Sequence, residues 1–294
     1  MLYLDESIKE LEYEKGVLIN LRYVILYLLI FASILFSSNW KFFYEISFEG
    51  LIDKLLKYRV IYLGEVHDKK EIHELQLKII KALYQRDKRL VITMEMFQQP
   101  FQEYIDLYIE GEIDEKEMLE KTQYKKRWGI SEELYRDIWK FAKRHGIKLY
   151  ALNVPFELLK EVRSKGLENI KSVYLPPRII FPDEEYRKFL IEQMKKHEGK
   201  FDEKRFIDIQ TAWDNGMAYK ILKLMVLYPD HRIVVIVGKG HLYKGYGIPF
   251  VLKRLYPKVR QAILYPVEDE KFYFLFSKDF SNEYSSTNSI RLPN

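Results

Sequence analysis

Along the chain, short runs of β-branched and other apolar residues alternate with stretches whose apolar residues recur at helical spacing. The short runs predict six strands, at Val60–Leu63, Leu90–Met94, Lys148–Leu152, Arg232–Val237, Gln261–Pro266 and Phe272–Phe276. The last two flank an acidic turn and predict a C-terminal β-hairpin. The alternation predicts an α/β fold, with a mainly parallel sheet flanked by helices.

The helical stretches carry start and stop signals. Asp68 and Glu71 have the spacing of a capping box ahead of a predicted helix that includes Ile72 to Leu83. A continuous helix is predicted from Ser131 to His145, because acidic residues begin it and basic residues followed by glycine end it. A long helix is predicted from Phe201 to Tyr228. Proline marks three further expected first turns, at Pro100, Pro155 and Pro249.

Three regions are predicted. Residues 1–45 contain an N-terminal apolar signal or anchor segment, residues 46–280 form the α/β domain, and residues 281–294 form a flexible tail. Within the domain, the stretches 100–131 and 172–200 are too long for simple connections, so they predict helical insertions.

The N-terminal segment favours export or membrane anchoring. Residues 23–36 form an uncharged apolar run, which is near the length of a signal-peptide core but short of a full membrane span. The residues before it are acidic rather than basic, so either the true start lies nearer Val17 or the segment is an uncleaved anchor. A buried core helix is the alternative. We expect a membrane-associated protein of the cell envelope.

Charge and composition remove several classes of function. Lysine and arginine number 48 against 43 aspartate and glutamate residues and are spread along the chain, so no basic stripe predicts a nucleic-acid partner. Cysteine is absent, which excludes disulfides, thiolate metal sites and cysteine nucleophiles. Any metal binding or catalysis must therefore use His, Asp, Glu, Tyr or Ser.

Polar residues directly follow the predicted strands. Glu65 and His67 follow the first strand, Glu95 the second, and His241 lies in the loop after the fourth. In open parallel sheets, ligands bind outside the carboxyl ends of the strands, so these side chains are expected in one crevice. A buried glutamate such as Glu95 would be costly unless it were paired or bound to a metal.

Two copies of the pattern Gly-x-x-His place the two histidines. The glycines, Gly64 and Gly238, are expected to let the backbone turn sharply and approach a ligand closely. Glu65, His67, Glu95 and His241 could ligate a divalent metal such as zinc or manganese, or could act as acid and base without one. Two further residues stay open: His73 as a functional or a surface residue, and Asp214 as a functional residue or a solvated helix edge.

Five blocks, in order, resemble the ChaN-like haem-binding family, which is related to Tiki and TraB proteins and to erythromycin esterases. The blocks are YLGEVHDKKEIHELQLKII, VITMEMFQQPFQ, LYALNVP, IQTAWDNGMA and VVIVGKGHLYKGYGIP. The resemblance implies haem binding linked to iron uptake at a bacterial envelope. It also implies roles for His67, His241, Glu65 and Glu95 by likeness to metal-dependent Tiki-like proteases. Many relatives look like lipoproteins, which a chain without cysteine cannot be.

Three functions follow from these observations. The first is a haem-binding protein, expected to form a homodimer around its ligand, with haem contacts from His67, His73, His241, Tyr243 and Tyr246. The second is a hydrolase of peptides or esters, with Glu65 or Glu95 as base and the two histidines binding metal or activating water. The third is an interaction module that uses the charged stretch from Asp114 to Arg127. The first reading is preferred.

Overall fold

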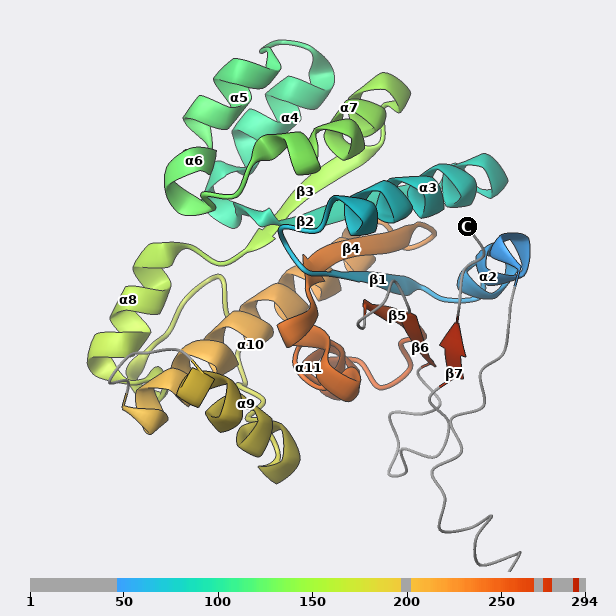
Figure 1. Ribbon diagram of the computed structural model, residues 1–294. Helices are drawn as coiled ribbons and strands as arrows, with labels where there is room; N and C mark the ends of the chain where they lie inside the picture. The colour runs from blue at the N-terminus through green and yellow to red at the C-terminus, as the bar shows by residue number, and fades with distance from the viewer. Residues whose placement is uncertain (1–46, 197–201, 267–271, 277–287, 291–294) are drawn as a thin grey trace, which may run out of the picture. The chain divides into compact units, whose positions relative to one another are not determined.

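The computed structural model describes residues 47–196, 202–266, 272–276 and 288–290. Within them, seven strands form one sheet in the order β3-β2-β4-β1-β5-β6-β7 (Figure 1). The pairs among the first five strands of this order are parallel, and β6 and β7 are antiparallel to their neighbours. The strands are β1 Val60–Glu65, β2 Leu90–Gln98, β3 Lys148–Asn153, β4 Arg232–Gly238, β5 Gln261–Pro266, β6 Phe272–Phe276 and β7 Asn288–Ile290. The predicted α/β class and hairpin are confirmed.

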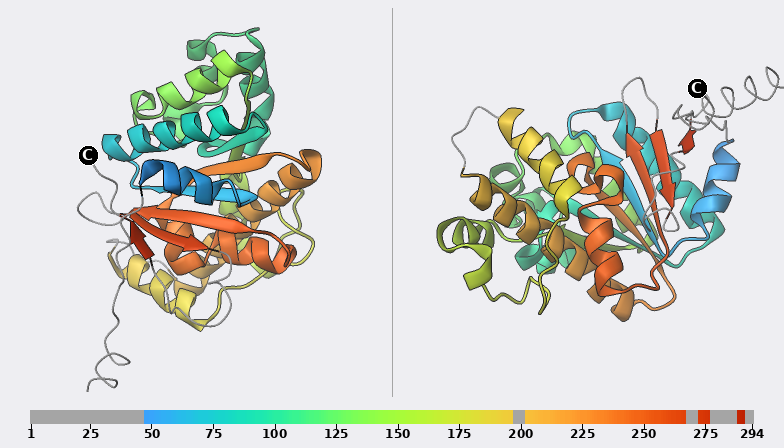
Figure 2. Two further views of the ribbon diagram at one scale, coloured as in Figure 1. Left: turned by 90° about the vertical axis from the view of Figure 1, so that its right-hand side faces the viewer. Right: turned by 90° about the horizontal axis from the view of Figure 1, so that it is seen from below.

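Helices cover both faces of the sheet. The α-helices are α2 Phe48–Leu55, α3 Lys70–Arg86, α4 Gln102–Glu110, α5 Glu115–Lys121, α6 Tyr124–Arg127, α7 Arg136–His145, α8 Phe156–Lys165, α9 Glu184–Lys196, α10 Glu203–Leu227 and α11 Ile248–Leu255. Short 3-10 turns occupy η1 Gln99–Phe101, η2 Glu132–Leu134, η3 Leu167–Asn169 and η4 Lys239–Gly245. The views in Figures 1 and 2 place α3 to α7 on one side of the sheet and α10 and α11 on the other.

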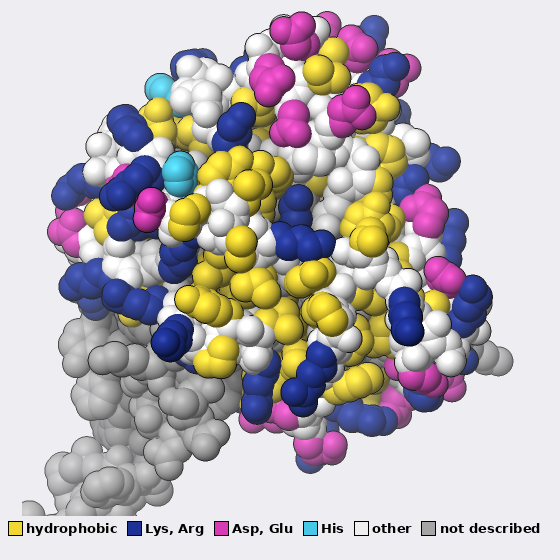
Figure 3. Space-filling view, turned by 180° about the vertical axis from the view of Figure 1, so that it is seen from behind, with side chains coloured by type: hydrophobic (Ala, Val, Ile, Leu, Met, Phe, Trp, Pro, Cys, Tyr) yellow, Lys and Arg dark blue, Asp and Glu magenta, His cyan; other side chains and the backbone are white. Residues whose placement is uncertain are grey.

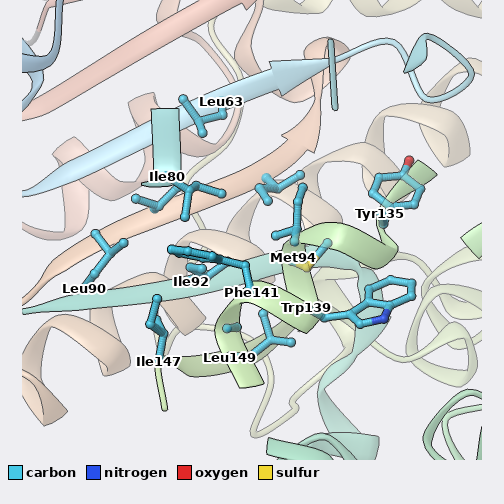
Figure 4. Close-up of a cluster of buried hydrophobic side chains, with 14 of the residues drawn as sticks. Leu63, Ile80, Leu90, Ile92, Met94, Tyr135, Trp139, Phe141, Ile147 and Leu149 are labelled. Carbon is cyan, nitrogen blue, oxygen red and sulfur yellow. The ribbon is translucent and has the colours of Figure 1, made fainter. Parts of the chain in front are cut away.

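Two apolar clusters hold these layers together. On one face, α3 and α7 pack against alternate residues of β1 and β2, including Leu63, Ile92 and Met94 (Figure 4). On the other face, α10 and α11 pack against strand residues whose side chains point the opposite way, such as Tyr62 of β1 and Val235 of β4. Both faces of the central strands are buried, which explains why their sequences are almost continuously apolar.

The chain order opens a crevice at the carboxyl ends of β1 and β4. These strands are adjacent, yet β1 leads into α3 on one face and β4 leads into η4 and α11 on the other. At such a switch point the two outgoing connections diverge, and this is where open parallel sheets bind their ligands, so we call the rim at the ends of β1 and β4 the crevice.

Several predicted helix ends are wrong. The residue that precedes α3 is Lys69, and its side chain makes no capping bond, so Asp68 and Glu71 form no capping box. The expected continuous helix from Ser131 is broken, because Ser131 caps the short turn η2 and α7 begins only at Arg136. Pro155 precedes α8 instead of lying in its first turn. The left-handed Gly146 that ends α7 was predicted correctly.

The predicted insertions are helical and partly structural. Residues 100–131 contain α4, α5 and α6, and the buried side chains of Met118 and Tyr124 join the core on that face. Removing residues 114–127 would therefore disturb the core, so this stretch is not a detachable module. Within the expected tail, Asn288–Ile290 pairs with β6.

The apolar run at residues 23–36 lies outside the described residues. Among the helices described here, none combines the length and the apolarity that a bilayer crossing requires.

Candidate functional site

Strand register brings the predicted site residues together. Glu65, the last residue of β1, lies opposite Gly238, the last residue of β4. On the other side of β4, Met94 of β2 lies opposite Ile236, so Glu95 follows one step beyond. Side chains from residues 65–67, 95 and 238–241 thus meet at one rim of the sheet, although they lie up to about 175 residues apart in sequence.

Glu65 and His67 form a fixed pair. The Nδ1 atom of His67 lies 2.7 Å from Glu65 Oε1, and the Tyr135 hydroxyl donates to the same oxygen at 2.8 Å. Gln76 donates to the other carboxylate oxygen at 3.3 Å. Because Glu65 is buried and occupied by these donors, it orients the imidazole rather than reaching a ligand. His67 Nε2 remains available, and this side chain is 37% exposed.

A second pair comes from α10 and η4. The Nδ1 atom of His241 lies 2.6 Å from Asp214 Oδ1, and the Tyr186 hydroxyl donates to Asp214 Oδ2 at 2.9 Å. The Nε2 atom of His241 lies 3.5 Å from Glu95 Oε1. His241 is only 12% exposed, so it is held between two carboxylates at the base of the crevice.

Glu95 joins the two halves. The main-chain N–H of Gly238 donates to Glu95 Oε2 at 2.7 Å. Burial would raise the pKa of Glu95, but the hydrogen bond from His241, the charges of both imidazoles and the Gly238 N–H outweigh it and lower that pKa. Glu95 is therefore an ionised carboxylate held at the base of the crevice.

The same carboxylates raise the pKa values of the two histidines. Burial would lower the pKa of His241, but Asp214 and Glu95 raise it to about 10, so His241 is an imidazolium at neutral pH. Burial also opposes the charge on His67, yet Glu65 and Glu95 leave its pKa raised. Burial raises the pKa of Asp214, although the adjacent His241 and the Tyr186 hydroxyl oppose this effect.

His73 lies behind the crevice and is buried. Its two ring nitrogens lie 3.1 Å from Gln76 Oε1 and 3.1 Å from the carbonyl oxygen of His67. Both nitrogens are thus engaged, and His73 supports the loop that carries His67.

Tyr243 and Tyr246 lie in an aromatic layer between η4 and α9. The ring of Tyr243 stacks on Phe189 with centroids 3.7 Å apart, and the ring of Tyr246 stacks on Tyr186 at 5.6 Å. The Tyr246 hydroxyl donates to Glu185 at 3.1 Å. Through Tyr186, this layer is connected to Asp214 and so to His241.

A tryptophan ring lies beside each of the two imidazoles. Trp128, which follows α6, lies edge-on to His67 with ring centroids 4.8 Å apart. Trp213 of α10 lies edge-on to His241 at 5.6 Å, and its indole N–H donates to Asn153 at the end of β3 at 2.5 Å. The crevice thus combines apolar aromatic surfaces with fixed polar groups, as ligand pockets generally do.

The glycines of the two Gly-x-x-His motifs make room for neighbouring atoms. The sharp turn expected at Gly64 is wrong, because this residue lies inside β1, whereas Gly238 ends β4 and directly precedes η4. Neither Gly64 nor Gly238 has a positive φ angle. A Cβ atom on Gly64 would lie 2.9 Å from the carbonyl oxygen of Leu264, and one on Gly238 would lie 2.8 Å from Cε1 of His67. Each glycine permits close packing, the second directly against the imidazole.

Gly238→Ala tests this packing. Its Cβ would also lie 3.0 Å from Nε2 of His67 and 3.4 Å from Glu95, so the imidazole must move while the fold is retained. We expect ligand affinity at the crevice to fall about tenfold, the size of effect seen when groups that orient a ligand are lost. Isothermal titration with hemin, the ligand that the family resemblance implies, measures this affinity. Gly240→Ala is the matched control, because nothing lies within 4 Å of a Cβ there, and an equal loss in this control would contradict the explanation.

The donor set does not form a ready-made divalent-metal site. Among the described residues, no group of three or more His, Asp or Glu side chains is placed to hold a metal ion. Glu65 is bound on both oxygens, and each of His67 and His241 has its Nδ1 atom bound to a carboxylate. Zinc or manganese binding by these four residues stays a prediction.

Sequence reasoning missed several residues around the crevice. Tyr135 and Tyr186 each place a hydroxyl on a site carboxylate, yet nothing distinguishes them among 23 tyrosines. For Asp214 the signal was present: it stands one turn from other buried positions of α10, and the structure shows it buried rather than solvated.

A comparison of the sequence with models of known protein families shows the family to which this chain belongs. The model described as haem-binding uptake, Tiki superfamily, ChaN matches residues 51–252, which include both Gly-x-x-His motifs and every side chain of the two imidazole pairs. The chain belongs to this family. The resemblance expected from its five blocks is therefore confirmed.

Similar structures and sequences extend this result. A structure described as cofacial heme binding to ChaN of Campylobacter jejuni is 19% identical, with a TM-score of 0.63, and the match covers 83% of this chain and 91% of that one. It supports the fold. An erythromycin esterase mutant in its open conformation is 15% identical with a TM-score of 0.44, over 78% of each chain.

A curated plant protein matches over a shorter region. Protein RETICULATA-RELATED 5, chloroplastic, of Arabidopsis thaliana is 28% identical over 136 residues. The match covers 42% of this ChaN-family chain but only 18% of the plant protein.

Proposed function

We propose that this protein binds haem in the crevice at the carboxyl ends of β1 and β4. The observation that carries the proposal is the partly exposed imidazole of His67, whose Nε2 makes no hydrogen bond within the described residues. The chain belongs to a family whose description names haem binding. Haem proteins need an axial His or Tyr ligand and an apolar slot for the porphyrin, and this crevice has an imidazole beside aromatic surfaces.

Among the candidate histidines, His67 fits the axial position best. His73 is buried with both nitrogens bound, and His241 is a nearly buried imidazolium. His67 instead donates from Nδ1 to Glu65, which fixes its tautomer and leaves Nε2 to face the ligand. When bound, haem would supply an iron centre, and His67 would hold it through Nε2.

Other residues of the crevice have supporting roles in this proposal. Trp128 offers an apolar edge beside His67. Tyr243 and Tyr246 stand in the aromatic layer behind η4, where they would contact the porphyrin rather than replace His67. Lys239, partly exposed at the start of η4, is a cation for a propionate.

A hemin titration of the purified full chain tests the proposal. We expect a Soret band that saturates at a fixed haem-to-protein ratio and survives the substitution His145→Ala, a histidine at the far end of α7. A change that never saturates, or that is equally large for an unrelated protein of similar charge, would reject haem binding.

A metal-free hydrolase is the second candidate, and the two imidazole–carboxylate pairs favour it. His67 could accept a proton at Nε2, and the cationic His241 could stabilise negative charge that develops on a bound ester or peptide. Glu95 would hold His241 in place rather than act as the base, because its oxygens already face Gly238 and His241.

An ester and peptide screen separates the two functions. If hydrolysis is genuine, His67→Ala lowers the rate at least 100-fold, the usual loss on removing a general base. His145→Ala leaves the rate unchanged. Equal activity in all three proteins would show that the turnover comes from a contaminant.

Localisation and assembly complete the proposal. We infer that the apolar run at residues 23–36 holds the protein at a bacterial envelope, where it takes part in haem or iron uptake, and that two copies assemble around haem. Light scattering with and without hemin tests the assembly. A mass that stays monomeric in both conditions would remove the homodimer.

A further inference from the structure

A second cavity lies at the opposite rim of the sheet, where the strands begin. Its volume is about 640 Å³. Residues that precede β1, β2, β4 and β5, together with the carboxyl end of α10, line it. The left view of Figure 2 faces this rim. It is separate from the crevice described above, because the strands run from one rim to the other.

The cavity is strongly cationic. Six basic side chains line it, namely Lys57, Arg59, Arg89, Lys258, Arg260 and Arg232. Among the residues that the structure describes, two carboxylates oppose them: Asp230 in the lining, and Asp87, which is paired with Arg89 and Arg232. Within the described part of the chain, Lys57, Lys258 and Arg260 take part in no ion pair, so most of this charge is uncompensated.

Two buried nitrogen atoms of lining residues, one of them a guanidinium nitrogen that can only donate, also lack partners among the described residues. Arg59 uses Nη2 to cap the carbonyl oxygens of Met225 and Tyr228 at the end of α10. Its Nη1 atom is buried without a hydrogen-bond partner in the described structure, and so is Nδ1 of His231. Buried polar atoms are normally satisfied, so two unpaired nitrogens in one cationic cavity point to an acceptor-rich ligand.

The rim beside the cavity is apolar and protrudes. Val226 is 75% exposed, Leu227 61% and Tyr256 43%, which is unusual for large hydrophobic side chains on a soluble surface. Figure 3 shows a comparable mixture on the back of the molecule, with hydrophobic side chains among lysine and arginine and few acidic groups near the centre. Cations beside exposed apolar groups are the pattern of a surface that meets anionic lipid.

We propose that this cavity binds a phosphate-bearing ligand, with Lys57, Arg59 and Lys258 around the phosphate. Arginine and lysine are the side chains that hold phosphate best, the first through parallel N–H donors and the second as a point charge. The phosphate can belong to the headgroup of an anionic lipid, which the exposed rim favours, or to a soluble phosphorylated molecule.

Binding of the full chain to vesicles and to pyrophosphate distinguishes these sources. Vesicles of phosphatidylcholine with 30 mol% phosphatidylglycerol are compared with pure phosphatidylcholine, so that any contribution of the uncharged run at residues 23–36 is common to both. With a lipid ligand, Lys57→Gln with Lys258→Gln should reduce the preference for anionic vesicles about 25-fold, at roughly fivefold per cation. Leu227→Ser, an exposed residue outside the lining of the cavity, should weaken vesicle binding but leave pyrophosphate binding unchanged.

Other results of these binding measurements would assign a different ligand to the cavity or overturn the proposal. Saturable pyrophosphate binding that is lost in the Lys57 and Lys258 variant, without any preference for anionic vesicles, would assign the cavity to a soluble phosphorylated ligand. The matched control is Lys116→Gln with Lys121→Gln, two exposed lysines of α5. No binding of either probe, or an equal loss in this control, would overturn the proposal.

Discussion

Asp214→Ala is expected to destabilise the protein by about 3 kcal/mol, because it breaks the short buried ion pair with His241 and leaves this imidazolium only the 3.5 Å contact to Glu95. The substitution removes the carboxylate at 2.6 Å from His241 and the acceptor of the Tyr186 hydroxyl. Chemical denaturation at pH 7 measures the change in the free energy of unfolding. In a His241→Ala background the same substitution should cost about 1 kcal/mol, since only a neutral hydrogen bond is then lost.

The effect of Asp214→Ala should depend on pH in one direction. The pKa of His241 is about 10 in the folded protein and 6.5 in its ordinary state, so the pair stabilises the fold fully below pH 6.5. This contribution is lost as the pH rises through about 10. The gap between wild type and variant should therefore narrow between pH 7 and pH 10. A gap that widens over this range would contradict an imidazolium at His241.

His67→Ala is expected to weaken hemin binding about 100-fold, since even residues that only orient a metal ligand cost 10- to 100-fold when removed. Stability should also fall, because the buried Glu65 loses its imidazole partner, so affinity is measured under conditions in which the variant is shown to be folded. Tyr243→Phe, which keeps the ring stacked on Phe189, should retain the affinity. If hemin affinity were instead lost only in Tyr243→Phe, the iron ligand would be Tyr243 and not His67.

The wild-type protein should bind hemin more tightly as the pH rises. Iron takes neutral imidazole, and Glu65 and Glu95 raise the pKa of His67, so a proton must leave Nε2 before it can bind. In His67→Ala this pH dependence should disappear. Imidazole added to that variant should restore the Soret band, an effect that a purely structural role of His67 would not produce.

The strands could be predicted from sequence because their signal is local. Each predicted strand was found, and β1, β2, β3 and β4 extend only one to four residues further, through the polar residues at their ends. Glu65 and Glu95 were expected just after strands, yet they lie inside β1 and β2. These extensions are buried as well, but they contain polar side chains such as Glu65 and Glu95, so the apolar run in the sequence ends before the strand does.

Convergence at the crevice was predictable from topology, but the identity of the partners was not. The rule that ligands gather at carboxyl ends of parallel strands was enough to place His67 and His241 together. It could not show that Asp214 of α10 faces His241, because that depends on the rotation of a helix about its axis. Helix ends failed similarly: Ser131 caps the short turn η2 instead of α7, and α3 begins after Lys69, so the capping signal at Asp68 is not used.

The most direct test is the position of iron in a crystal structure of the hemin complex, located from its anomalous scattering. We predict iron bound to Nε2 of His67 at the carboxyl ends of β1 and β4, with Glu65 still bonded to Nδ1. Iron found away from this rim of the sheet would contradict the account.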